Sequence, residues 1–103
     1  MIVAEVSVLP LGTESPCVGR YVTAAIRELE ASGLRCTPGP MGTMVEAEST
    51  EEIYTAVTRA QAAIFNFGIG RVYTILKVDE RRDVESQTAE QMLRSVRGEQ
   101  ETR

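Results

Sequence analysis

The sequence contains no histidine, no tryptophan and only two cysteines, Cys17 and Cys36, among its 103 residues. Histidine is the commonest general base in enzymes and belongs to most serine and cysteine nucleophile arrangements, so its absence argues against these forms of catalysis. Two isolated cysteines without histidine also leave no cluster of zinc ligands. We therefore expect a protein that is not an enzyme and that uses no metal and no cofactor.

Positive charge and aromatic side chains are scarce as well. Eleven Lys and Arg residues face fifteen Asp and Glu residues, which gives a formal net charge of −4, and aromatic residues make up 5% of the chain. An acidic surface repels phosphate backbones, and the aromatic pattern of RNA-binding sheets is missing, so we expect no nucleic-acid partner.

Long apolar runs are missing too. No stretch approaches the roughly 20 apolar residues of a membrane span, and the apolar start of the chain is interrupted by Glu5 without a basic region before it, unlike a signal peptide. We expect no membrane partner, a cytoplasmic location and reduced thiols.

The hydrophobic and charged fractions, 43% and 25%, are those of an ordinary globular protein. A chain of this length fits one domain. We therefore expect a single domain over residues 1–103, with a polar, frayed tail at residues 98–103.

Hydrophobic periodicity predicts four strands, over residues 2–9, 34–38, 41–48 and 71–79. It also predicts three helices. The first spans residues 16–32, the second begins after a capping box of Ser49 and Glu52 and carries an apolar stripe to Phe67, and the third is a short amphipathic helix over residues 86–97.

Two features near the first predicted helix have structural interpretations. Ser15 and Pro16 are typical of a helix start, and Gly33 is typical of the position after a helix end. Cys17 would then lie in the first helical turn, where the helix dipole lowers a thiol pKa. Because no base or second thiol accompanies it, we do not expect Cys17 to act in chemistry.

The order strand, helix, strand, strand, helix, strand is that of the split βαβ motif. Right-handed crossovers place both helices on one face of a four-stranded antiparallel sheet. We therefore predict a ferredoxin-like α+β sandwich with the short third helix added at its C-terminal end.

The face of the sheet without helices, called the open face below, is where we expect function. In the first strand the uniformly apolar side, Ile2, Ala4, Val6 and Val8, suits the helices. Alternation then assigns both apolar and polar residues to the open face: Val3, Glu5, Ser7, Leu9, Gly42, Met44, Glu46, Tyr73, Ile75 and Lys77. Such a mixed surface is typical of an interface or a ligand site, and we expect two sheets to meet face to face in a homo-oligomer.

Three motifs carry a resemblance to a known family: EVSV followed by PLGT at residues 5–13, PMGT at residues 40–43, and KVDERRD at residues 77–83. In these motifs, and over nearly its whole length, the chain resembles the YkoF-like thiamine-binding proteins. The resemblance implies a ferredoxin-like fold and sheet-to-sheet dimers that often pair into tetramers. It also implies binding of thiamine or its pyrimidine part, without established catalysis.

Candidate ligand contacts follow from the chemistry of thiamine, a permanent cation with an aminopyrimidine edge. A carboxylate, Glu5 or Glu46, could bind the charge or the amino group, and Met44 and Tyr73 could form walls. Hydroxyl groups could meet the pyrimidine; the candidates are Ser7, Thr13, Ser15 and Thr43, of which Thr43 needs a local bend to leave the helix side.

Other interpretations stay open at this point. Glu5, Glu46 and Lys77 could form only a charge network, and Arg81 and Arg82 could bind an anion or form ion pairs between subunits or in water. The open face could instead recruit a partner protein, which would make the chain a regulatory or structural module.

Overall fold

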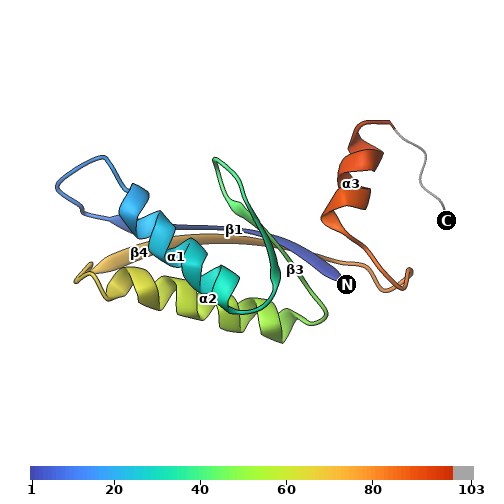
Figure 1. The fold of residues 1–103 in the computed structure, drawn as a ribbon, viewed down its shortest axis with the longest axis horizontal. Coiled ribbons are helices and arrows are strands. Elements are labelled where there is room, and N and C mark those ends of the chain that lie inside the picture. Colours follow the sequence, from blue (N-terminus) through green and yellow to red (C-terminus); the bar gives the residue numbers. More distant parts are fainter. Residues whose placement is uncertain (99–103) are drawn as a thin grey trace.

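The structure, a computed structural model, describes residues 1–98, so the expected frayed tail lies outside the described residues except for Gly98. Figure 1 shows a sheet with one helix below it, a second helix that crosses in front of it, and a third helix above one end. The elements are β1 (Ile2–Leu11), α1 (Gly19–Ala31), β2 (Arg35–Pro38), β3 (Thr43–Ala47), α2 (Thr50–Phe65), β4 (Arg71–Glu80) and α3 (Ala89–Val96). This order confirms the predicted ferredoxin-like α+β fold.

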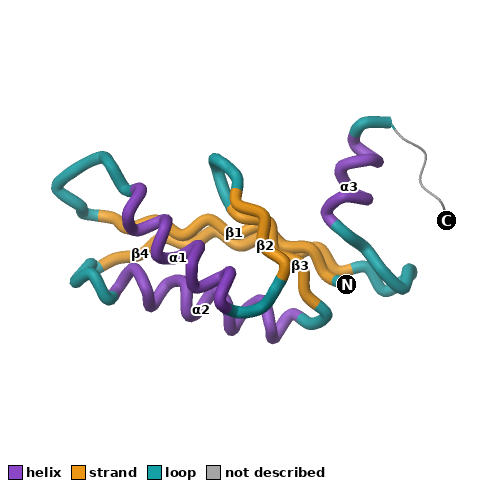
Figure 2. The backbone as a smooth tube through the Cα atoms, viewed as in Figure 1, coloured by secondary structure: helices purple, strands orange, loops and turns teal. Residues whose placement is uncertain are grey.

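The four strands form one antiparallel sheet in the order β2-β3-β1-β4, with α1 and α2 on the same face (Figure 2). β1 pairs with β4 from Ile2 to Leu11, but with β3 only from Ile2 to Val6. The second half of β1 therefore has a free edge. Pro10 lies in this half, where a strand tolerates a residue without an N–H group.

The core lies between the sheet and the two helices. Ile2, Ala4, Val6 and Val8 of β1 are buried in it, as are Val45 and Ala47 of β3. They pack with Tyr21, Ala25, Leu29, Ile53, Ala56, Val57, Ala60 and Ile64 of the helices, while Val72 and Leu76 of β4 pack at its margin. The assignment of residues to the two faces of the sheet is confirmed.

The predicted start of the first helix is wrong. α1 begins at Gly19, and its N-cap residue, Val18, makes no side-chain cap. Ser15 Oγ instead accepts a hydrogen bond from the Cys17 amide at 3.1 Å. A serine that bonds an amide two residues ahead favours a turn over a helix, so Cys17 lies in an exposed loop.

The predicted start of α2 is confirmed, whereas its predicted apolar stripe extends too far. Ser49 Oγ accepts from the Glu52 amide, and the Glu52 carboxylate accepts from the Ser49 amide, which completes the capping box. The helix ends at Phe65, and Phe67 lies in the turn that follows. There its ring packs edge to face against Tyr21, with 5.0 Å between the ring centroids.

α3 is shorter than predicted and begins at Ala89, after a capping box of Thr88 and Gln91. It stands on the side of the sheet opposite to α1 and α2 (Figure 1). None of its residues is buried, and Leu93 and Val96 are exposed. Within residues 1–98, no helix has the length and apolar character that crossing a membrane requires.

Replacing Ile53, which has no solvent exposure, by alanine should lower the free energy of unfolding by about 2–5 kcal/mol, because the change leaves a cavity in the core. Urea denaturation followed by circular dichroism measures the difference. Thr55→Ala, at an exposed position of the same helix, is the matched control and should change stability by less than about 0.5 kcal/mol. Equal losses in the two variants would contradict this placement of the core.

Candidate functional site

The open face contains a cavity of about 660 Å³ near the start of β1. Its volume is in the range of small-molecule sites, although it opens widely to solvent. All three longer strands and α3 contribute to its lining: Val3, Ala4 and Glu5 from β1, Met44 from β3, Lys77, Val78, Asp79 and Glu80 from β4, and Met92 from α3. Five apolar and four charged residues thus line the cavity.

Glu5 is the carboxylate at the centre of this arrangement. In the register of the sheet it lies opposite Met44 on one side and Lys77 on the other. The Lys77 ammonium lies 3.2 Å from Glu5 Oε1, and the side chains of lysine and glutamate are 75% and 40% exposed. The Glu5 side chain is therefore partly shielded from water, whereas the Lys77 side chain is mostly exposed to it.

Gly42 leaves room for the Glu5 side chain. A Cβ atom added at Gly42 would lie 3.1 Å from Glu5 Cγ and 3.3 Å from the Val6 carbonyl oxygen. The φ angle of Gly42 is not positive, so backbone conformation does not require glycine at this position. The limit on a larger residue here is instead the close approach of Glu5 and of the Val6 carbonyl oxygen.

Glu46, the other candidate carboxylate, has a hydrogen-bond partner within the chain. It is on the open face as predicted, but it is 9% exposed, and its Oε1 accepts a hydrogen bond from the Ala89 amide at 3.1 Å. A carboxylate at the N-terminus of α3 also complements the helix dipole. Glu46 thus holds α3 against the sheet.

Gln87 makes a second attachment beside the first. Its Nε2 donates to the carbonyl oxygen and the carboxylate of Asp79, at 3.3 and 3.2 Å. Val3, an open-face residue at this end, is only 2% exposed. The sequence interpretation missed this anchoring of α3, although the pattern Thr88-Ala89-Glu90-Gln91 was a signal for the helix start.

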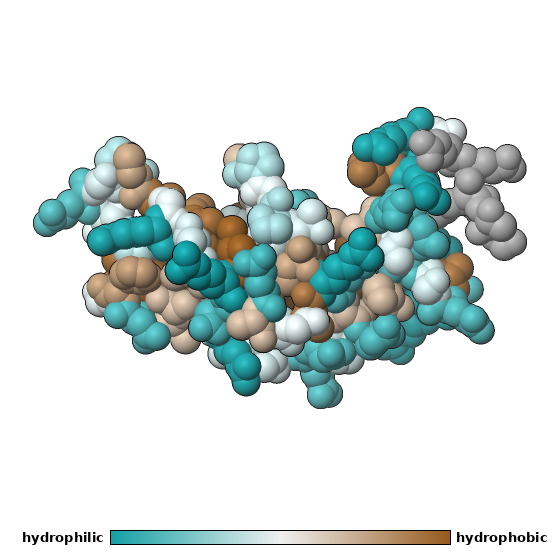
Figure 3. Space-filling model, viewed as in Figure 1, coloured by the Kyte–Doolittle hydropathy of each residue, from teal (hydrophilic) through white to brown (hydrophobic). Residues whose placement is uncertain are grey.

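A second, smaller hollow of about 180 Å³ lies between the free edge of β1, α1 and the β2–β3 hairpin. Figure 3 shows apolar surface between the β1–α1 loop and this hairpin. Ser7 and Thr43 both line the hollow. Thr43 is 4% exposed and lies opposite Val6, so it keeps its place on the helix side without the bend that a contact on the open face would need.

The remaining candidates lie toward the other end of the sheet. Thr13 Oγ1 donates to the Ser15 carbonyl oxygen at 2.8 Å, within the β1–α1 loop that lies far from α3 in Figure 1. Tyr73 lies opposite Leu9 on β1 and is 52% exposed. The structure therefore brings Glu5 and Met44 together at one cavity and Ser7 and Thr43 at another. It places Thr13, Ser15 and Tyr73 at neither.

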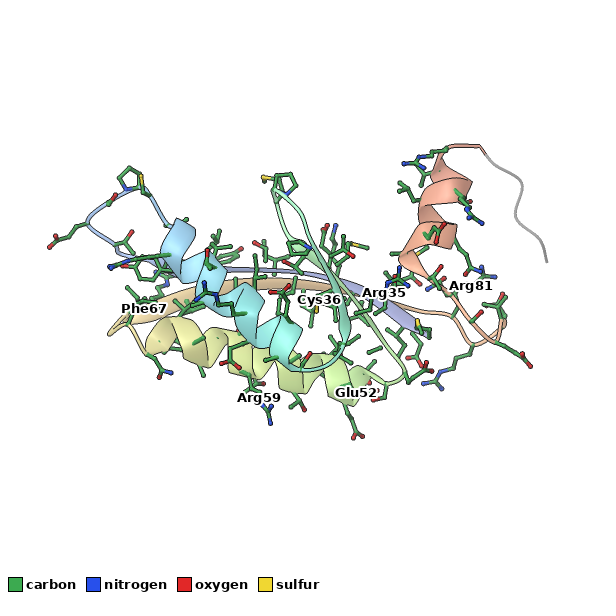
Figure 4. The ribbon with its side chains drawn as sticks, viewed as in Figure 1. Arg35, Cys36, Glu52, Arg59, Phe67 and Arg81 are labelled. Atoms are coloured by element: carbon green, nitrogen blue, oxygen red, sulfur yellow. The ribbon has the colours of Figure 1, made fainter. Side chains whose placement is uncertain are left out.

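Arg81 and Arg82 both have carboxylate partners within the chain. Arg81 donates to Asp83 from Nε at 2.9 Å and from Nη2 at 2.6 Å, and Arg82 Nε lies 3.3 Å from Glu80. Figure 4 shows Arg81 in the turn between β4 and α3. Both arginines thus form ion pairs within the chain, whereas the sequence had left open an anion site or ion pairs between subunits or in water.

Cys36, labelled in Figure 4, points into the protein from β2. Its Sγ lies 3.3 Å from the Leu29 carbonyl oxygen, and burial, with a smaller effect of Glu30, raises the pKa of the thiol. A raised pKa disfavours the reactive thiolate. Among residues 1–98 no group of three or more cysteine and acidic side chains could hold a metal ion.

Gly42→Ala should displace the Glu5 carboxylate, because the new methyl group lies closer to Glu5 Cγ than a carbon contact normally allows. Crystal structures of the parent and the variant measure the displacement. Gly70→Ala is the control, since a Cβ atom at Gly70 meets nothing within 4 Å and its φ is not positive. A Glu5 side chain that keeps its position in Gly42→Ala would contradict the role given to this glycine.

Comparison with known proteins adds to this geometry. The chain is 45% identical over 85 residues to a UPF0045 protein of Methanothermobacter thermautotrophicus, which covers 82% of this chain and 86% of the relative. It is 34% identical to the UPF0045 protein YqgV of Bacillus subtilis, over 93% of this chain and 94% of that one.

A solved structure agrees with the fold. The crystal structure of the hypothetical protein MJ1052 from Methanocaldococcus jannaschii matches with a TM-score of 0.83 and 36% identity, over 92% of this chain and 94% of that chain. The family model described as "Thiamine-binding protein" matches residues 4–97, which include β1 from Ala4 onward, α3 and every residue that lines the open-face cavity except Val3. The chain belongs to the thiamine-binding protein family.

Proposed function

We propose that this protein binds thiamine, or its pyrimidine part, in the open-face cavity around Glu5, without catalysing a reaction on it. The observation that carries the proposal is the partly buried carboxylate of Glu5 in a cavity that two methionines also line, and whose acidic residues, Glu5, Asp79 and Glu80, outnumber its one lysine. Such a group is suited to a small organic cation. The family to which the chain belongs is named for thiamine binding, which supports this choice among cations.

The walls of the cavity suit the flat, charged thiazolium ring. Met44 and Met92 line it from β3 and α3, and thioether groups are polarisable and adapt to aromatic ligands. Glu5 supplies the opposite charge and could alternatively accept from the pyrimidine amino group. The hydroxyl groups of Ser7 and Thr43 belong to the neighbouring hollow and would meet only a ligand that extends past Gly42.

The proposal includes a homo-oligomer in which open faces meet. The end of the open face away from α3 exposes Leu9, Tyr73 and Ile75, at 38%, 52% and 51%. Leu93 and Val96 of α3 are exposed above the same face. A second copy would cover both apolar areas and close a cavity that is too open in one chain to exclude water from a ligand.

Thiamine should bind the parent protein and raise its melting temperature, since a ligand at 100 times its Kd adds about 2.7 kcal/mol of stability. Glu5→Gln should weaken binding roughly five- to tenfold by removing the charge that faces the cation. Isothermal titration calorimetry measures both affinities. Pyrimidine without the thiazolium should lose less affinity in Glu5→Gln than thiamine does.

Glu30→Gln, on the exposed surface of α1, is the matched control and should leave the affinity for thiamine unchanged. Absence of binding by thiamine, its phosphates and the pyrimidine would contradict the proposed function. It would favour the second candidate, a module whose exposed apolar face binds a partner protein.

Ile75→Glu should convert the parent oligomer into monomers, because it puts a charge into the centre of the proposed subunit contact. Thr55→Glu, on the exposed side of α2, should leave the assembly intact. Sedimentation velocity or light scattering after gel filtration gives the mass. A parent protein that is monomeric at micromolar concentration would contradict the proposed assembly.

A further inference from the structure

We infer that Lys77 is an internal competitor of the ligand: its ammonium group occupies the cation position at Glu5 and leaves when a cationic ligand binds. This inference rests on the proposed function and adds to it the residue that determines selectivity for charge. In the empty site Lys77 pairs with the Glu5 carboxylate, and a ligand must supply a positive charge of its own to replace the lysine.

The two members of the ion pair differ in their freedom to move. The Lys77 side chain is 75% exposed and extends from the surface of β4, so most of it is in water already when it pairs with Glu5. Among the described residues Glu5 is the only ion-pair partner that Lys77 has within 4.0 Å. No second carboxylate therefore holds it in place.

Glu5 is less exposed than the lysine. Its side chain is 40% exposed, lies directly against Gly42 and comes from β1, which is inside the sheet. Met44 lies beside it across the strand pair. When Lys77 leaves, Glu5 remains among the residues that line the cavity and faces whatever occupies it.

Charge selectivity follows from this exchange. A cationic ligand replaces one ion pair by another, whereas a neutral ligand that displaces Lys77 leaves Glu5 unpaired in a partly buried position, which is unfavourable. Since the number of ion pairs does not change when a cation binds, the affinity of the parent protein should depend only weakly on ionic strength.

The test is titration of the full-length parent, Lys77→Gln and Arg71→Gln with thiamine by calorimetry, at about 20 mM and about 200 mM salt. Without its competitor, Lys77→Gln should bind thiamine about two- to fivefold more tightly at low salt, as expected for loss of an exposed pair. Its affinity should fall with salt more steeply than that of the parent, because binding now creates an ion pair.

Arg71→Gln is the matched control. Arg71 is exposed at the far end of β4 on the same face, so this variant loses the same charge without touching the pair. Equal tightening in the two variants, or no tightening in Lys77→Gln, would overturn the inference while leaving the proposed function intact. If no form binds thiamine, the proposed function fails and this inference falls with it.

Lys77→Met is the second variant if Lys77→Gln does not fold, and Lys77→Arg completes the series. The methionine variant should also bind more tightly, whereas the arginine variant, which keeps a cation opposite Glu5, should bind no more tightly than the parent. Tightening by Lys77→Arg to the level of Lys77→Gln would show that the charge of residue 77 is not what opposes the ligand.

Discussion

The fold depends on the two different faces of β1. This strand lies between β3 and β4, and its side chains alternate between the core and the open face. On the core side every residue from Ile2 to Val8 is apolar and nearly unexposed. A shift of one residue in register would move Glu5 and Ser7 into the core and four apolar side chains out of it, so burial strongly selects one register.

The same register places the proposed site. Because Glu5 lies opposite both Met44 and Lys77, one strand pairing sets which groups meet on the open face. β3 stops pairing with β1 at Val6, and the hairpin that precedes β3 brings Gly42 beside Glu5. The short length of β3 therefore determines both the space around the carboxylate and the free edge of β1.

Periodicity was sufficient to predict the fold and the contents of the open face, because both depend on alternation within single strands. It correctly assigned Glu5, Met44 and Tyr73 to that face. It was insufficient where one local signal competed with another. Ser15 and Pro16 resemble a helix start, but the hydroxyl group of Ser15 bonds the Cys17 amide and forms a turn.

The role of Glu46 could not be predicted for a different reason. Its partner, the Ala89 amide, is 43 residues away along the chain, and no pattern within a strand or a helix reports such a contact. Alternation within the strands assigns both Glu5 and Glu46 to the open face and gives no reason to distinguish them. The position of α3 distinguishes Glu46, which bonds the start of that helix, from Glu5, which pairs with the exposed Lys77.

If the open-face cavity binds a cation, as proposed, it must also be stable when it is empty, and the pairing of Glu5 with an exposed lysine meets this requirement. A carboxylate that is deeply buried binds a cation strongly but destabilises the protein whenever the ligand is absent, whereas a fully hydrated one contributes little to affinity. Glu5 is between these limits, and the exposed ammonium of Lys77 compensates its charge in the free protein. If open faces meet in an oligomer, water is excluded from Glu5 and from its partner, whether that is Lys77 or a ligand. The electrostatic interactions of Glu5 then strengthen, so the affinities for a cationic and a neutral ligand differ more. Assembly and selectivity would then be linked through one carboxylate, which belongs to the strand on which the fold itself depends.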